Sequence, residues 1–268
     1  MKRIALAVAA GVLALSAACI MVMDPLDPDQ PASARIPARM FERTLDLAPG
    51  GSLSVSHILG TLKITGWDRE AVEVVAVGGP GSLGEDTGFR IVGPWDPGQQ
   101  VEVGRTDDGV EVRTTLSRGS REPLPLDYTI RVPSSVNLED VRLDRGEAAV
   151  ADLYGRARIE VGEGSLTVRN FSGPLTATVG AGPADVEVLD VRPADVIAIT
   201  VRKGDIVLRL EPDASVRIEA EAPRGEITSD FDLGLELPAK TVSAGLGDGA
   251  ASVTLKAADG NIRILKTG

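Results

Sequence analysis

Large aromatic rings, cysteine and histidine are all scarce in this chain of 268 residues. Aromatic residues make up 3% of the sequence, which predicts a thin core built from Val, Ile, Leu and Ala. The single cysteine, Cys19, excludes an internal disulfide. The single histidine, His57, argues against most hydrolase triads and nearly all zinc sites. We therefore expect no catalytic residue, no metal site and no cofactor.

Basic residues are in the minority. The chain has 28 Lys and Arg against 39 Asp and Glu, which gives a formal net charge of −11 at pH 7. A phosphate backbone needs a basic surface, so the charge argues against nucleic acid as a partner and is better explained by solubility. Hydrophobic residues make up 43% of the chain and charged residues 25%, which predicts a buried core rather than disorder.

The N-terminus has the layout of a secretory signal, because Lys2 and Arg3 precede an apolar run. We predict a signal segment over residues 1–18. It resembles a bacterial lipoprotein signal, in which the small residues of "LSAAC" would precede lipid attachment at Cys19. Two alternatives stay open. Residues 4–23 contain no charge and are long enough to remain as a membrane anchor, or the segment is cleaved and the protein is released as a secreted or periplasmic form. In each case the rest of the chain lies outside the cytoplasm.

Prolines mark the segment that follows the signal. "DPLDPDQPASARIPAR" contains four prolines and no apolar periodicity. We therefore predict a Pro-rich tether over residues 19–40, which would hold the remaining chain away from the membrane. Residues 41–266 are predicted to form one domain of repeated β-strands.

The repeated domain shows apolar alternation with a period of two from about residue 141 onward. In "ARIEV", Ala157, Ile159 and Val161 lie on one face, whereas Arg158 and Glu160 lie on the other. "SLTVR", "LTATV", "DIVLRL" and "SVRIEAE" repeat this pattern, and no window of comparable length outside the signal segment has helical spacing. The sequence therefore predicts an all-β protein.

Glycines recur at nearly constant spacing between these strands. Successive corner glycines are 18, 18, 22 and 21 residues apart, at Gly146, Gly164, Gly182, Gly204 and Gly225. Gly60 and Gly260 look like outlying copies. This spacing predicts a single-domain β-solenoid that is similar to a parallel β-helix, with about 20 residues per rung. An antiparallel β-sandwich is the alternative, since short strands with regular turns suit it as well.

An irregular segment interrupts the repeat near its start. Residues 78–100 are rich in glycine and proline, and Asp108–Gly109 lies between two alternating segments, which predicts a hairpin. We expect this N-terminal excursion to cap one open end of the solenoid, where strand edges would otherwise be exposed.

Two stretches resemble the bacterial DUF4097 family of adhesin-like β-strand-repeat proteins. They are "FERTLDLAPGGSLSVSHILGTLKITGWDREAVEVVAV" and "YTIRVPSSVNLEDVRLDRGEAAVADLYG", which combine a strand, a Val-Pro and repeated glycine–acidic corners. The resemblance covers roughly residues 41–266. It implies a β-helix-like coil and an adhesin-like role, and it brings no catalytic residues.

Two kinds of side chain are candidates for a site. Five acidic side chains fall on different rungs and could stack on one another. They are Glu160, Asp185, Glu187, Asp190 and Asp205. Such outward charges usually form a solvated face. Of the two tryptophans, Trp67 is expected to cover the end of a rung, whereas Trp95 is the better candidate for contact with a ligand such as a sugar.

These features predict an adhesin-like binding or scaffold module that is tethered to the membrane in the cell envelope and has no catalytic activity. Its expected partners are the membrane, through lipidated Cys19 or an N-terminal anchor, and a protein or glycan of the envelope. A β-helix enzyme that degrades polysaccharides and a purely structural envelope protein are the alternatives.

Overall fold

The computed structural model describes residues 39–78, 99–116, 123–234 and 238–268. Contacts divide the chain into two compact units, Met1–Ile36 and Pro37–Gly268, and all the described residues belong to the second. Within them the regular structure is 17 strands in one mixed sheet, with no helix, so the all-β prediction is confirmed there. The described part also contains no helix that is long and apolar enough to cross a membrane.

Three long strands bend at a glycine and so contribute to two rows of paired strands. They are β2 (Ser52–Trp67), β7 (Asn137–Tyr154) and β8 (Ala157–Ser172). Strand β8 shows the cause, because its sequence ARIEVGEGSLTVRNFS holds two alternating apolar segments separated by Gly-Glu-Gly. The apolar side chains of both segments are buried and the charged ones point outward.

The first row contains the N-terminal halves of the three long strands. Across the row the order is β4–β5–β2–β7–β8–β9–β11–β16–β13–β15, and every pairing except the two outermost is parallel. The remaining members are β4 (Gln99–Arg105), β5 (Gly109–Leu116), β9 (Leu175–Ala181), β11 (Val196–Lys203), β13 (Val216–Glu221), β15 (Thr241–Leu246) and β16 (Ala251–Ala257).

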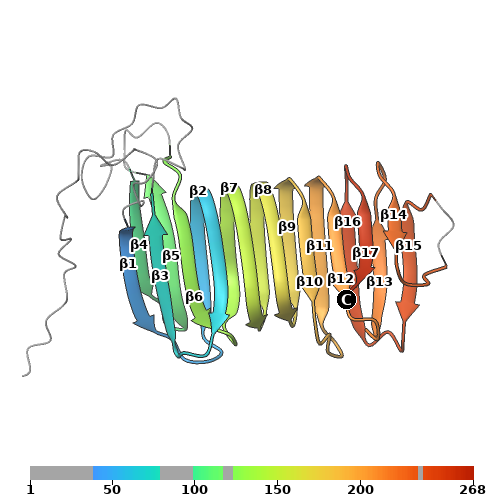
Figure 1. Cartoon of the computed structure of the whole chain (residues 1–268), viewed down its shortest axis with the longest axis horizontal. Helices are drawn as coiled ribbons and strands as arrows, with labels where there is room; N and C mark the ends of the chain where they lie inside the picture. Colours follow the sequence, from blue (N-terminus) through green and yellow to red (C-terminus); the bar gives the residue numbers. More distant parts are fainter. Residues whose placement is uncertain (1–38, 79–98, 117–122, 235–237) are drawn as a thin grey trace, which may run out of the picture. The chain divides into compact units, whose positions relative to one another are not determined.

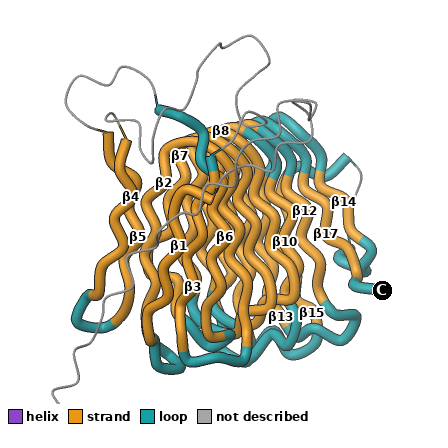
Figure 2. The backbone as a smooth tube through the Cα atoms, turned by 60° about the vertical axis from the view of Figure 1, so that its left-hand side comes forward, coloured by secondary structure: helices purple, strands orange, loops and turns teal. Residues whose placement is uncertain are grey.

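The second row contains their C-terminal halves. Its order is β1–β3–β6–β2–β7–β8–β10–β12–β17–β14, in which only the first two pairings are antiparallel. The remaining members are β1 (Arg39–Asp46), β3 (Ala71–Val77), β6 (Asp127–Pro133), β10 (Ala184–Val188), β12 (Ile206–Leu210), β14 (Ile227–Ser229) and β17 (Ile262–Lys266). Figure 2 shows the strands side by side, with loops gathered at their ends.

The corner glycines stack on one another. A Cβ atom added at Gly164 would overlap the carbonyl oxygen of Gly146, and one at Gly146 would overlap that of Gly60. The same relation continues through the column in the order Gly60, Gly146, Gly164, Gly182, Gly204, Gly260 and Gly225. Gly164 also has a φ of 132°, which L side chains rarely adopt. The glycines that recur in the sequence therefore lie next to one another in a single column.

The last strands of the sequence are not the last strands of the two rows. Strand β16 pairs with β11 on one side and β13 on the other, and β17 pairs with β12 and β14 in the same way. In Figure 1 the red strands β16 and β17 accordingly lie between neighbours that are earlier in the sequence. Gly260 therefore precedes Gly225 in the glycine column although it follows Gly225 in the chain.

Two antiparallel strand pairs form the N-terminal ends of the rows. Strands β4 and β5 pair directly across the short turn at residues 106–108, so the predicted hairpin is confirmed. Strands β1 and β3 extend the second row. Arg43 of β1 donates a hydrogen bond of 2.7 Å from Nη1 to the carbonyl oxygen of Val103 in β4, which links the two rows at this end.

Candidate functional site

A flat group of short, uncharged side chains lies on three neighbouring strands of the first row, β9, β11 and β16. In register, Ala198 lies between Thr176 and Thr254, Thr200 lies beside Thr178, and Val196 lies beside Ser252. We call these seven residues the threonine patch. Parallel strands lie about 4.8 Å apart, and alternate residues along a strand are about 6.6 Å apart, so the patch presents hydroxyls on a regular grid.

Charged side chains border the threonine patch on both sides. Arg158 and Glu160 of β8 lie beside Thr176 and Thr178, and Glu219 of β13 lies beside Thr254. Lys256 of β16 lies beside Thr200. The patch is therefore an uncharged area on the surface of a chain in which 25% of residues are charged. Val196 adds an apolar surface to it, since 52% of this residue is exposed.

The hydroxyl groups of the threonine patch are available to a ligand. Within the described part of the chain, none of them forms a hydrogen bond with another protein group. The backbone beneath them is held by parallel pairing on both sides of β11, so their spacing is fixed by the sheet. Rigid, unpaired polar groups on a flat surface suit contact with another macromolecule better than chemistry on a small substrate.

The acidic side chains predicted to stack do not form a cluster. Glu160 lies on the first row, 3.9 Å from Arg142, whereas Asp185 lies on the second row. Asp190 pairs with Arg192 at 3.3 Å, Asp205 pairs with Arg263 at 3.5 Å, and Glu187 of β10 is half-buried. Among the described residues, no three His, Cys, Asp or Glu side chains are placed to hold a metal ion together.

Asp185 is held between arginines from the two neighbouring strands. Arg169 of β8 donates to it from Nη2 at 2.7 Å, and Arg209 of β12 donates to its other oxygen. Burial opposes ionisation of Asp185, but these hydrogen bonds and charges outweigh that effect and lower the pKa of the carboxyl below its ordinary value. Asp185 is thus an ionised link between strands and is poorly suited to donate a proton near neutral pH.

Trp67 lies at the end of β2 and is only partly exposed. Its indole Nε1 donates a hydrogen bond of 2.8 Å to the carbonyl oxygen of Ala71. The guanidinium carbons of Arg69 and Arg131 lie 5.0 Å and 6.0 Å from the ring centroid, which are cation–π distances. These contacts fit the predicted covering role of Trp67. The other tryptophan, Trp95, and the lipid-attachment candidate Cys19 lie outside the described residues.

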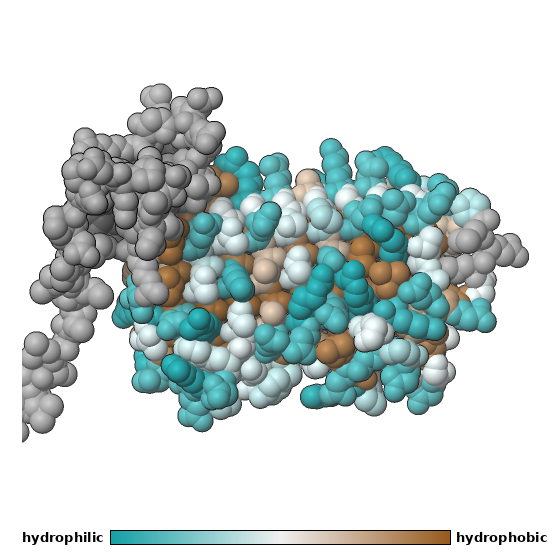
Figure 3. Space-filling view, viewed as in Figure 1, coloured by the Kyte–Doolittle hydropathy of each residue, from teal (hydrophilic) through white to brown (hydrophobic). Residues whose placement is uncertain are grey.

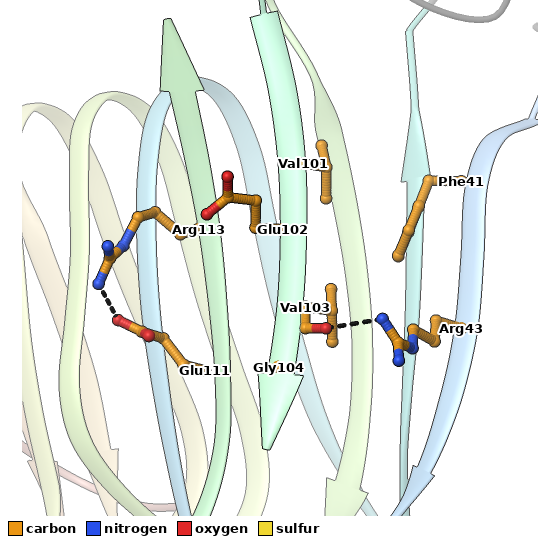
Figure 4. A pocket seen from close by; sticks show the side chains of 8 residues that line it. All are labelled: Phe41, Arg43, Val101, Glu102, Val103, Gly104, Glu111 and Arg113. Atoms are coloured by element: carbon orange, nitrogen blue, oxygen red, sulfur yellow. Dashed lines mark hydrogen bonds and ion pairs between the residues drawn. The ribbon is translucent and has the colours of Figure 1, made fainter. Parts of the chain in front are cut away.

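A shallow pocket of about 330 Å³ lies beside β1 and β4 at the N-terminal end (Figure 4). Phe41, Val101 and Val103 contribute its apolar lining. Three of its four charged groups are already engaged within the described chain, since Glu111 pairs with Arg113, and Arg43 is bound to the Val103 carbonyl; Glu102 is the exception. We therefore favour the exposed sheet surface over this pocket. On the face drawn in Figure 3, hydrophilic, neutral and hydrophobic side chains are intermixed.

The single histidine belongs to a buried chain of hydrogen bonds. His57 Nε2 lies 3.0 Å from the Leu126 carbonyl oxygen, which can only accept, so Nε2 carries the proton. Nδ1 therefore accepts from the Thr114 hydroxyl at 3.3 Å, and the Tyr128 hydroxyl donates to Thr114 at 2.8 Å. Burial lowers the pKa of His57 to about 4 and raises the pKa of Tyr128 to about 12. This cluster joins β2, β5 and β6 through polar contacts.

The buried histidine makes stability depend on pH. The pKa of His57 is about 4 in the folded state against 6.5 for the free side chain, so the unfolded state binds more protons between these values. We expect the free energy of unfolding to fall as the pH drops from 6.5 to 4, by up to roughly 3 kcal/mol at about 1.4 kcal/mol per pH unit. Urea unfolding at several pH values measures this. The His57→Gln variant should show a clearly flatter dependence; an equal slope in both proteins would contradict the assignment.

The threonine patch and the histidine cluster are the features that sequence reasoning missed. The patch had a signal, because the outward positions of "LTATV" and "VIAIT" are Thr, Ala or Val where other strands carry charges. That these segments lie side by side follows only from the pairing of β9 with β11. The histidine cluster had no comparable signal, since Thr114 and Tyr128 are 57 and 71 residues from His57.

Two solved structures resemble this chain. One comes from Clostridium sporogenes, is provisionally described as a cell adhesion protein, and matches 85% of this chain and 99% of that chain with 14% identity and a TM-score of 0.51. The other, provisionally described as an adhesin from Bacteroides fragilis, matches 84% of this chain and 96% of that chain with 11% identity and a TM-score of 0.30. At 14% identity, the likeness to the first shows a shared fold alone. No protein-family model and no curated protein matches the chain.

Proposed function

We propose that this protein is an adhesin-like module of the cell envelope that binds a protein or glycan through the threonine patch and has no catalytic activity. The observation that carries the proposal is the regular, uncharged group of unpaired hydroxyls on β9, β11 and β16. The shared fold with a protein provisionally described as a cell adhesion protein supports the same role.

We further propose that the sheet is a β-solenoid rather than an antiparallel sandwich. In-register parallel pairing through β2, β7 and β8 supports this, as does the column of seven glycines that repeats at one corner. The sequence motifs support a relation to the DUF4097 family. A solenoid suits adhesion, because its stacked strands give a long rigid face on which contacts can repeat.

The contacts of Asp185 favour a binding module over the alternative, a β-helix enzyme that degrades polysaccharides. Such an enzyme needs carboxylates that are free to exchange protons or hold a cation, whereas Arg169 and Arg209 already engage one acidic candidate, Asp185. A purely structural envelope protein would need no unpaired patch. Depolymerisation of an acidic glycan by the protein would support the enzyme instead.

Binding to envelope material tests the proposed function. We expect the double variant Thr178→Lys, Thr200→Lys to lose at least about tenfold in affinity for purified envelope polysaccharide or protein, because two long cations would stand on a flat surface. The matched control is Thr65→Lys, Thr167→Lys on the second row, which should bind as the unaltered protein does. Loss of binding in the control alone would indicate that the binding site lies on the second row instead. No binding by either the variants or the unaltered protein would favour a purely structural role.

We also propose that the module is tethered to the membrane through lipidated Cys19, with an N-terminal anchor or a released form as the alternatives. The small residues of "LSAAC" support lipidation. The mass and membrane partitioning of the Cys19→Ala variant test this. Values identical to those of the unaltered protein would exclude lipidation.

A further inference from the structure

Strand β15 presents an unpaired edge at the C-terminal end of the first row. It pairs with β13 alone, and the Ala222 amide donates to the Lys240 carbonyl oxygen just before the strand begins. In an antiparallel pair the backbone groups of alternate residues point to the same side, so Thr241, Ser243 and Gly245 direct theirs away from β13. Within the described chain, no hydrogen bond involves these outward backbone groups.

The β15 edge lacks the features that normally prevent pairing between strands. Its sequence TVSAGL has no charged residue and no proline. The N-terminal edge strand β1 contrasts with it, since RMFERTLD contains four charged residues. Charges on an edge strand discourage association, and their absence leaves a template for another strand. On the core side of β15, Val242 is buried, whereas Ala244 and Leu246 are half-buried and pack against the core.

We propose that β15 pairs antiparallel with β15 of a second copy of this chain. A two-fold axis at Ala244 places Ser243 opposite Gly245 of the second copy, which matches outward backbone groups with one another. The same register places Val242 opposite Leu246 of the second copy, so the half-buried core side chains become covered. The two first rows then continue into each other as one sheet.

Charge complementarity favours a second copy as the partner. In this register Lys240, just before β15, and Asp248 of the second copy, just after its β15, lie at the same end of the paired strands, and this arrangement occurs twice because the interface is symmetric. Both side chains are exposed, and among the described residues neither has an oppositely charged group within 4.0 Å. The Lys240 ammonium donates to the Pro223 carbonyl oxygen, and Asp248 accepts from Ser215, so both groups are held near the edge. The contacts provide local attraction between two chains that each carry a net charge of −11.

A pair of proline variants tests the edge. Ser243→Pro removes an outward amide, and proline is tolerated at an edge position whose amide faces solvent. We expect this variant of the full chain in detergent to keep its unfolding transition and to become monomeric by light scattering, whereas the unaltered chain is dimeric. The matched variant Ala244→Pro removes an amide that bonds to β13 and should lower stability as well. A dimer that persists in folded Ser243→Pro, or an unaltered chain that is monomeric at about 100 μM, well above a micromolar Kd, would overturn the proposal.

Charge exchange and cross-linking test the register and the identity of the partner. Lys240→Glu should weaken dimerisation by about tenfold, and adding Asp248→Lys should restore it. In the Cys19→Ser background, Ala244→Cys should form a disulfide-linked dimer on oxidation, because directly opposed residues in a non-hydrogen-bonded pair lie about 4.5 Å apart. Thr178→Cys, which is exposed on β9, is the control and should not cross-link. Equal cross-linking at both positions would contradict the register, and binding of β15 to a peptide from another protein, with no dimer, would contradict a second copy.

Discussion

Deleting residues 251–268 is expected to abolish cooperative folding, although the deletion removes only the C-terminal end of the chain. Strands β16 and β17 separate β11 and β12 from β13 and β14, so their loss leaves a gap inside both rows. Val253, Leu255, Ile262 and Ile264 are fully buried there. Losing four such side chains, at about 2–5 kcal/mol each, matches or exceeds the total stability of about 5–15 kcal/mol of a typical domain. Urea unfolding followed by circular dichroism measures the result.

The control for this deletion is a variant that lacks β1, the strand at the opposite edge of the second row. Replacing residues 39–46 with a flexible linker of equal length removes β1, which pairs with β3 alone. We expect that variant to be less stable but to retain a cooperative transition. A C-terminal deletion that unfolds like this control would show that β16 and β17 form a dispensable end rather than an internal rung.

Replacing Gly164 with alanine is expected to destabilise the protein by at least about 3 kcal/mol. Two costs add at this position. The φ of 132° is unfavourable for an L side chain, and the new Cβ would overlap the carbonyl oxygen of Gly146 on the adjacent rung. Since the overlap involves backbone on both sides, the rungs would have to move apart. Chemical unfolding of the variant and of the unaltered protein gives the difference.

The matched control for Gly164 is another strand glycine, Gly104 of β4. A Cβ atom at Gly104 would meet nothing within 4 Å, and its backbone does not have positive φ. Gly104→Ala should therefore be neutral or slightly stabilising, because alanine restricts the unfolded chain. Equal losses at the two positions would mean that strand glycines matter generally and that the corner column has no special role.

Local features of the fold could be predicted from the sequence. The alternation in "ARIEV" and "LTATV" identified inward and outward faces correctly, because a strand places successive side chains on opposite sides. Asp108–Gly109 identified the hairpin for a local reason as well, since Asp and Gly favour the tight turn that joins two paired strands. The corner glycines were visible because close approach between rungs recurs at a fixed spacing.

The order in which the rungs stack and the residues of the threonine patch could be determined only from the structure. Gly225 and Gly260 fit the same corner, and the sequence around each of them does not indicate which one stacks on Gly204. The threonine patch likewise depends on which strands are neighbours, because β9 and β16 flank β11 although about 70 residues separate them in the chain. The arginines around Asp185 are also partners across strands, so their pairing could not be derived from the spacing of acidic residues.

Disulfide formation between chosen pairs of positions tests the order of the rungs most directly. Thr200 and Lys256 are exposed and in register on adjacent strands, about 4.8 Å apart, whereas Thr200 and Glu221 are two strands apart, at about 10 Å. In the Cys19→Ser background, the structure predicts that the cysteine pair at 200 and 256 forms a disulfide on mild oxidation and that the pair at 200 and 221 does not. A disulfide between 200 and 221, with none between 200 and 256, would mean that the rungs follow the sequence order and would contradict the stacking described here.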